Sequence, residues 1–228
     1  MSYISDNLNE IENRVAAACD CGNRVRNEVL LIAVSKTKPI ELLNEAYQYG
    51  IRDFGENRVQ ELSEKAQMLP EDIRWHMIGH LQKNKVKQAV RYAYMIHSVD
   101  SYELALTISN EAVKQNKTVS ILLEVNMAGE ESKFGYTPTQ VAEDIIRIAS
   151  LPNIRIKGLM TIAPYTETPE SNRIYFQQMK QLSVDIRNKN IDNVSMDVLS
   201  MGMSGDFAIA IEEGATMVRV GTSIFGER

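Results

Sequence analysis

The chain has 228 residues, of which 44% are hydrophobic and 24% are charged, so it can bury a sizeable core. Its formal net charge of -5 argues against a general nucleic-acid or membrane-surface binder, because such proteins present a basic face. Residues 1–22 contain several acidic side chains and no continuous apolar stretch. We therefore expect neither a secretory signal nor a transit peptide, and a cytoplasmic protein.

Apolar segments of strand length recur along the whole chain. Several of them are apolar on consecutive residues, which indicates a sheet that is covered on both faces. The expected strands are 29–35, 53–57, 74–79, 95–99, 119–126, 154–162, 197–202 and 217–221.

Helical patterns lie between these strands, and a further one precedes the first. Pro39 in the first turn and Gly50 at the end bound one helix. Thr137 and Gln140 have the spacing of a capping box, and Pro169 follows a threonine at another helix start. The expected helices are 5–19, 39–50, 138–149 and 169–188.

Eight strands with intervening helices predict an α/β fold, namely a single (β/α)₈ TIM barrel over residues 1–228 with an extra N-terminal helix. The alternative is an open, doubly wound sheet. No GxGxxG motif follows the first strand, and eight units favour closure of the sheet, so we prefer the barrel.

Polar residues follow several of the strands, and function in such barrels gathers at the carboxyl ends of the strands. The sequence therefore predicts that one mouth of the barrel collects the residues Lys36, Asn57, Gly79, His80, Asn126, Ser200 and Arg219.

Lys36 comes directly after the first buried strand. An ordinary lysine has a pKa near 10.4, so forming the neutral amine at pH 7 costs roughly 4.6 kcal/mol. Desolvation and neighbouring positive charge lower that cost, and the neutral amine is then a nucleophile for a carbonyl group. The alternative is a lysine whose ammonium group simply reaches solvent.

The last strand leads into a candidate anion site. Gly221 and Thr222 begin a short helical turn after this strand, where barrels often bind phosphate through backbone N–H groups. Ser200 and Gly202 belong to a second loop of this kind. An amine facing a phosphate site suggests pyridoxal 5'-phosphate (PLP), and Arg219 would then donate to its ring nitrogen.

Six motifs closely resemble those of the pyridoxal phosphate homeostasis proteins, the YggS/PROSC family, and they run over essentially the whole chain in the same order. They are AVSKTKP (33–39), DFGENRVQE (53–61), WHMIGHLQKNK (75–85), GLMTIAP (158–164), LSMGMSGD (199–206) and VRVGTSIFG (218–226). The family is similar to the N-terminal barrel of alanine racemase, called PLP fold type III.

The resemblance implies a role for each matching residue. Lys36 would hold PLP as a Schiff base, Asn57 would lie beside the cofactor, and Arg219 would meet the ring nitrogen. The phosphate would be bound by Ser200, Gly221 and Thr222, with Met203 nearby. Members of the family are regarded as monomers without catalytic turnover that maintain cellular PLP, so PLP-dependent apo-enzymes are candidate partners.

Two other functions compete with reversible PLP binding. One is an amino-acid racemase, which needs a second base opposite Lys36; in the racemases that the chain resembles, a second domain supplies it. The chain ends at Arg228, so we expect no such domain, and Tyr136 or Tyr165 would have to replace that base. The other is a barrel that acts only through protein partners.

Three further features suggest additional roles. Lys133, in the loop 128–136, would capture an aldehyde transiently, although most loop lysines are only solvated. The stretch 83–87, KNKVK, together with Arg91 predicts a basic helix that is either a solvated face or a dock for an acidic partner. His80 is either an acid–base group or a structural histidine.

Overall fold

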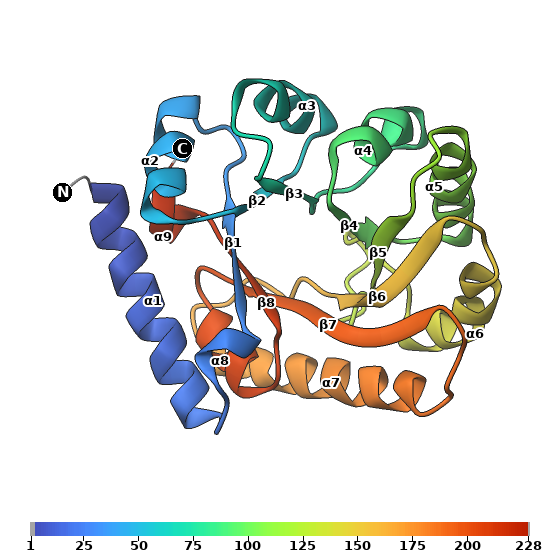
Figure 1. Ribbon diagram of the computed structural model, residues 1–228. Helices are drawn as coiled ribbons and strands as arrows, with labels where there is room; N and C mark the ends of the chain where they lie inside the picture. Colours follow the sequence, from blue (N-terminus) through green and yellow to red (C-terminus); the bar gives the residue numbers. More distant parts are fainter. Residues whose placement is uncertain (1–2, 228) are drawn as a thin grey trace.

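Eight parallel strands form a closed barrel in the computed structural model, which describes residues 3–227 (Figure 1). The strands pair in chain order, and the last strand pairs with the first. The predicted TIM barrel is therefore confirmed. The strands are β1 Leu30–Val34, β2 Asp53–Glu56, β3 Arg74–Met77, β4 Met95–Val99, β5 Val119–Glu124, β6 Ile154–Met160, β7 Val194–Met203 and β8 Met217–Val220.

Helices connect successive strands and cover the outside of the barrel (Figure 1). The α-helices are α1 Tyr3–Cys21, α2 Ile40–Tyr49, α3 Val59–Met68, α4 Val86–Tyr92, α5 Tyr102–Lys114, α6 Pro138–Ala149, α7 Arg173–Arg187, α8 Phe207–Glu212 and α9 Thr222–Phe225. Short 3₁₀ turns lie at η1 Arg26–Glu28, η2 Lys83–Lys85 and η3 Pro169–Asn172.

Two of the expected helices are divided by the structure. The segment 169–188 begins with the 3₁₀ turn η3, and its α-helix starts only at Arg173. The basic stretch 83–87 is likewise mostly the turn η2, and α4 begins at Val86. In both cases a tighter first turn precedes a regular helix, which is frequent at helix N-termini.

Apolar residues pack in two separate places. Most of the core lies between the strands and the surrounding helices. A smaller cluster lies apart from it and contains Ile32, Met95, Leu122, Met160 and Met217, all of them strand residues. Side chains on a strand point alternately to its two faces, so this small cluster fills the inside of the barrel.

The N-terminal helix α1 packs beside α2, α8 and α9, next to the barrel closure (Figure 1). Its buried side chains, among them Ile4, Leu8, Ile11 and Val15, recur at helical spacing and form one apolar face. The Asn7 side chain also donates a hydrogen bond of 2.9 Å to the carbonyl of Ile224 in α9. The extra helix therefore supports the turn that follows β8.

No helix among residues 3–227 is both long enough and apolar enough to cross a lipid bilayer.

The capping box predicted at the start of α6 is present. The Thr137 hydroxyl accepts from the backbone N–H of Gln140 at 3.2 Å, and the Gln140 side chain accepts from the N–H of Thr137 at 3.0 Å. We expect Thr137→Ala to lower the free energy of unfolding by about 1 kcal/mol, because it leaves a helical N–H without its partner. Urea denaturation measures this loss. Thr137→Ser is the control and should retain most of the stability; equal losses in both variants would contradict the capping role.

Candidate functional site

A cavity of about 360 Å³ lies at the carboxyl ends of the strands. Its lining comes mainly from the segments that follow β1, β2, β6, β7 and β8. This is the end at which barrel proteins carry their function, and the volume suits a small ligand.

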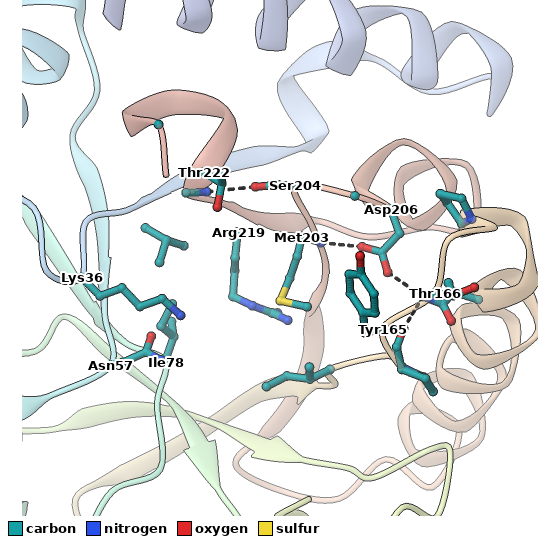
Figure 2. A pocket seen from close by; sticks show the side chains of 18 of the residues that line it. Lys36, Asn57, Ile78, Tyr165, Thr166, Met203, Ser204, Asp206, Arg219 and Thr222 are labelled. Carbon is teal, nitrogen blue, oxygen red and sulfur yellow. Dashed lines mark hydrogen bonds between the residues drawn. The ribbon is translucent and has the colours of Figure 1, made fainter. Parts of the chain in front are cut away.

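Most of the predicted site residues line this cavity. Figure 2 shows Lys36 reaching in from the β1 side, close to Asn57, whereas Arg219 and Met203 come from the opposite side and Thr222 lies at the turn after β8. The predicted residues that the structure brings together here are Lys36, Asn57, Met203, Arg219, Gly221 and Thr222.

The backbone on both sides of Lys36 is held by side chains of α3. Lys65 donates to the carbonyl of Ser35 at 2.8 Å, and Glu61 accepts from the backbone N–H of Thr37 at 2.7 Å. Thr37 has a φ of 62°, a left-handed conformation that a β-branched residue rarely adopts. These two contacts therefore fix an unfavourable turn and with it the point from which the Lys36 side chain starts.

Lys65 and Glu56 form a buried ion pair beneath this turn. Their Nζ and Oε1 atoms are 2.7 Å apart, and the Ser35 hydroxyl donates to the same carboxylate oxygen at 2.6 Å. Burial raises the pKa of Glu56 above its ordinary value, although Lys65 and Ser35 act in the opposite direction. The charge of Lys65 thus favours the ionised form of this buried carboxylate.

Asn57 is placed by a close approach of two backbone segments. A Cβ atom on Gly79 would lie only 2.4 Å from the carbonyl oxygen of Asn57. Only glycine permits this contact between the ends of β2 and β3.

The turn after β8 presents hydroxyl and backbone groups to the cavity. The Gly221 N–H donates to the Ser204 hydroxyl at 3.3 Å, and both Ser204 and Thr222 line the cavity. The first N–H groups of a helix such as α9 have no carbonyl partner within the helix. Lys38 holds the far end of the turn by donating to the carbonyls of Phe225 at 3.2 Å and Gly226 at 2.9 Å.

The loop that carries Ser204 is held by Asp206. One carboxylate oxygen of Asp206 accepts from the N–H of Met203 at 2.7 Å, and the other accepts from the Asn172 side chain at 2.9 Å. Asn172 also donates to the carbonyl of Pro164 at 3.0 Å, so the loops after β6 and β7 are joined. The sequence analysis did not identify Ser204, Lys38 or Asp206 as site residues. The aspartate three residues after Met203 could have indicated the turn, because aspartate side chains commonly accept hydrogen bonds from backbone N–H groups in turns.

Arg219 is a buried cation, and 4% of its surface is exposed. Its Nη1 donates to the Ser200 hydroxyl at 2.7 Å and its Nη2 to the carbonyl of Thr161 at 2.8 Å. Burial lowers its pKa to about 10, while Glu124 and Asp206 favour the charged form. Arg219 is therefore positively charged at neutral pH.

Ser200, which was expected to bind phosphate, is not among the described residues that line the cavity. It is 1% exposed and lies beneath Arg219, where its hydroxyl also contacts Nδ1 of His97 at 3.0 Å. The serine hydroxyl that this loop places on the cavity wall is that of Ser204. The register of β7 against β8 shifts between Ser200 and Met203, and this irregularity separates the positions of the two serines.

His80 and Lys133 lie outside the cavity lining. The His80 ring stacks on Phe134 with 3.8 Å between ring centroids, and its Nδ1 lies 3.1 Å from a carboxylate oxygen of Asp100. Lys133 is exposed on the loop that carries Phe134. These contacts favour the structural interpretation of His80.

The two candidate tyrosines occupy different places. Tyr136 is buried, its hydroxyl has no hydrogen-bond partner among the described residues, and burial raises its pKa. Tyr165 lines the cavity but is 95% exposed to solvent, at the mouth (Figure 2).

Comparison with known proteins gives a consistent result. The model of the family "Alanine racemase, N-terminal domain" matches residues 7–228. The "Pyridoxal phosphate homeostasis protein" of Aquifex aeolicus is 44% identical over 224 residues, which are 98% of this chain and 97% of that protein. The structure of PipY from Synechococcus elongatus PCC7942, solved with PLP bound, has a TM-score of 0.85 and 34% identity, covering 98% of this chain and 100% of that chain.

A more distant neighbour is alanine racemase of Clostridium difficile 630. It has a TM-score of 0.77 and 15% identity, and the match covers 98% of this chain and 57% of the racemase. At this identity the likeness shows the fold alone.

The role of the buried ion pair between Lys65 and Glu56 can be tested by removing the lysine charge. We expect Lys65→Met to lower the free energy of unfolding by about 3 kcal/mol at pH 8, because it leaves Glu56 buried without its cation. The pKa of Glu56 is already raised by burial, and losing Lys65 raises it further. The folded state then holds a proton to higher pH than the unfolded state does, so the loss should shrink as pH falls toward 5.

Urea denaturation at pH 5 and pH 8 measures this difference. The double variant Lys65→Met/Glu56→Gln removes both charges and should recover part of the loss at pH 8. A loss of equal size at both pH values would show that Lys65 acts by packing and not by charge.

Proposed function

The chain belongs to the family of pyridoxal phosphate homeostasis proteins, whose barrel is the alanine racemase N-terminal domain, and from this premise we propose that it binds PLP reversibly and takes part in intracellular PLP homeostasis. One observation carries the proposal: Lys36, Arg219 and the turn at Gly221 and Thr222 line the same cavity. PLP needs a nucleophilic amine for its aldehyde, donors for its phosphate and a partner for its ring nitrogen. The residues present fit all three requirements.

Lys36 is proposed to hold the aldehyde carbon as a Schiff base. The amine of Lys36 would add to the aldehyde carbon with loss of one water molecule, and water could reverse this bond and release the cofactor. The contacts of Lys65 and Glu61 with the neighbouring backbone support this role, because they fix where the lysine side chain begins.

The phosphate is proposed to lie against the turn after β8. Thr222 and Ser204 offer hydroxyl groups, and backbone N–H groups at the start of α9 offer further donors. Gly221 lets this turn approach β1, since a Cβ atom there would lie 3.1 Å from the carbonyl oxygen of Val34. We assign Ser204 to the phosphate in place of Ser200, because Ser204 is the serine on the cavity wall.

Arg219 is proposed to donate to the ring nitrogen, with Asn57 and Met203 beside the ring. A charged guanidinium can only donate hydrogen bonds, so it favours an unprotonated ring nitrogen. When bound, PLP supplies an electron sink, and an unprotonated ring is a weak one.

Racemisation is the competing function, and the cavity gives it limited support. It needs a base on the face opposite Lys36. Tyr165 is the tyrosine among the described lining residues, and its 95% exposure leaves nothing to fix its position. Tyr136 is not among the lining residues. We therefore propose a PLP-binding protein without catalytic turnover.

Further parts of the proposal concern the cellular setting. We propose that the chain acts as one PLP-binding domain over residues 1–228, as a monomer in the cytoplasm. PLP-dependent apo-enzymes are the proposed recipients of the cofactor. The open mouth supports this idea, because Tyr165 and Met203, both exposed, leave the cavity accessible to water and to a recipient.

Removal of the amine tests the covalent link. We expect the wild-type protein with PLP to absorb in the visible range and to become labelled at Lys36 after borohydride reduction. Lys36→Ala should lose this absorbance and any label at that position. Lys114→Ala, which removes an exposed lysine on α5, is the matched control and should behave like wild type. A label at Lys133 in the Lys36→Ala protein would support transient capture of the aldehyde by Lys133. If the Lys36→Ala protein still absorbs in the visible range and is reduced without a label at Lys133, the Schiff base is not on Lys36.

Turnover is tested separately. We expect the PLP-loaded protein to leave L-alanine and L-serine unchanged over hours, as measured by chiral chromatography, because Tyr165, the tyrosine among the described lining residues, is exposed and not held in place. A known alanine racemase run in parallel shows that the assay works. Conversion that disappears in Tyr165→Phe would instead establish racemisation.

A further inference from the structure

A row of buried polar side chains crosses the inside of the barrel from β2 to β8. Nε2 of His76 lies 3.0 Å from Oδ1 of Asp53, and Nδ1 of His76 lies 2.9 Å from Nε2 of His97. Nδ1 of His97 lies 3.0 Å from the Ser200 hydroxyl, which accepts from Arg219 at 2.7 Å. Both histidines are fully buried, in a place where barrels usually have apolar residues.

One consistent set of hydrogen-bond directions leads from Arg219 to Asp53. The Arg219 guanidinium donates to the Ser200 oxygen, which leaves the hydroxyl hydrogen of Ser200 available to Nδ1 of His97. His97 then donates from Nε2 to His76, and His76 donates from Nε2 to the Asp53 carboxylate. Each histidine is neutral in this arrangement and carries its proton on Nε2.

The charges around the row agree with that direction. Burial, together with the nearby charge of Arg219, holds the pKa of His97 well below its usual range. Burial also acts to raise the pKa of Asp53, but hydrogen bonds from Arg74 and His76 outweigh it, so the pKa lies below its ordinary value. The lowered pKa of His97 agrees with a neutral ring that accepts from Ser200.

The row determines how Arg219 is held. The Ser200 oxygen accepts from one terminal nitrogen of the guanidinium, and the carbonyl of Thr161 accepts from the other. The two acceptors fix the plane of the group. In this arrangement the Ser200 hydrogen points to His97, and a lone pair of the same oxygen accepts from Arg219.

We propose that Asp53, His76, His97 and Ser200 form a positioning chain for Arg219, so that Ser200 serves the ligand through Arg219 and does not bind phosphate. The inference rests on the proposed function, because it assumes that Arg219 meets the ring of PLP. None of the four residues lines the cavity, so each is a positioning residue.

Two aldehydes separate this role from phosphate binding. PLP and 5-deoxypyridoxal share the ring and the aldehyde, but a methyl group replaces the phosphate arm in the second. A residue that acts on the ring through Arg219 affects both ligands, whereas a residue that binds phosphate affects PLP alone. Spectroscopic titration of the ligand-free protein gives both dissociation constants.

We expect Ser200→Ala and His97→Leu to weaken both ligands by a similar factor, on the order of tenfold, since the first removes an acceptor of the charged Arg219 and the second leaves that acceptor without its own partner. The double variant should be little worse than either single variant, because both break one chain. His97→Asn keeps an acceptor toward Ser200 and should recover part of the affinity. Thr222→Val is the matched phosphate control and should weaken PLP more than 5-deoxypyridoxal.

Other results overturn the proposal. If Ser200→Ala weakens PLP but leaves 5-deoxypyridoxal unchanged, Ser200 is a phosphate ligand. If His97→Leu is folded and binds both aldehydes like wild type, the chain does not position Arg219.

Nuclear magnetic resonance of the ligand-free wild type tests the chain independently of ligand binding. Long-range proton–nitrogen spectra should show His76 and His97 neutral at pH 7, each protonated on Nε2. A proton on Nδ1 of either ring reverses a link and refutes the chain. Failure of wild type to bind either aldehyde, with these tautomers present, would instead refute the proposed function.

Discussion

Closure of the barrel between its first and last strands is the constraint on which the site depends. β1 and β8 pair in parallel with Ala33 opposite Val220, so both strands deliver their next residues to the same edge. Lys36 follows on one side and the turn at Gly221 on the other, and both line one cavity although they are distant in sequence. An open sheet with the same sequential strand order would leave these strands at opposite edges.

The protein stabilises two buried cations beside this cavity in different ways. Lys65 is paired directly with Glu56, and this pair holds the backbone near Lys36. Arg219 instead contacts a hydroxyl and a carbonyl, and a row of side chains separates it from the carboxylate of Asp53. A direct carboxylate partner would occupy the guanidinium donors, whereas neutral acceptors leave more of its positive field for a ligand.

The fold and most of the cavity could be predicted from the sequence because their signals are local. Consecutive apolar residues indicated the strands, and Lys36, Asn57 and Gly221 each follow a strand directly, so parallel pairing alone brings them together. Ser200 and Ser204 could not be separated in this way. Their placement depends on the shift in register between β7 and β8, where Gly202 has a φ of 90°. This shift interrupts the regular alternation of side chains between the two faces of the strand, so spacing alone does not tell which serine faces the cavity.

His76 and His97 were missed for a related reason. Each lies within a strand, and no spacing along the chain links residues that are 21 positions apart. Their contact arises because β3 and β4 are neighbours whose inward faces share the barrel interior. A histidine in an apolar strand is therefore informative only when another polar residue faces the same interior, and here Ser200 and Arg219 do so from β7 and β8. Because it is costly to bury a polar side chain without a hydrogen-bond partner, a polar residue inside the barrel is expected to face other polar residues there.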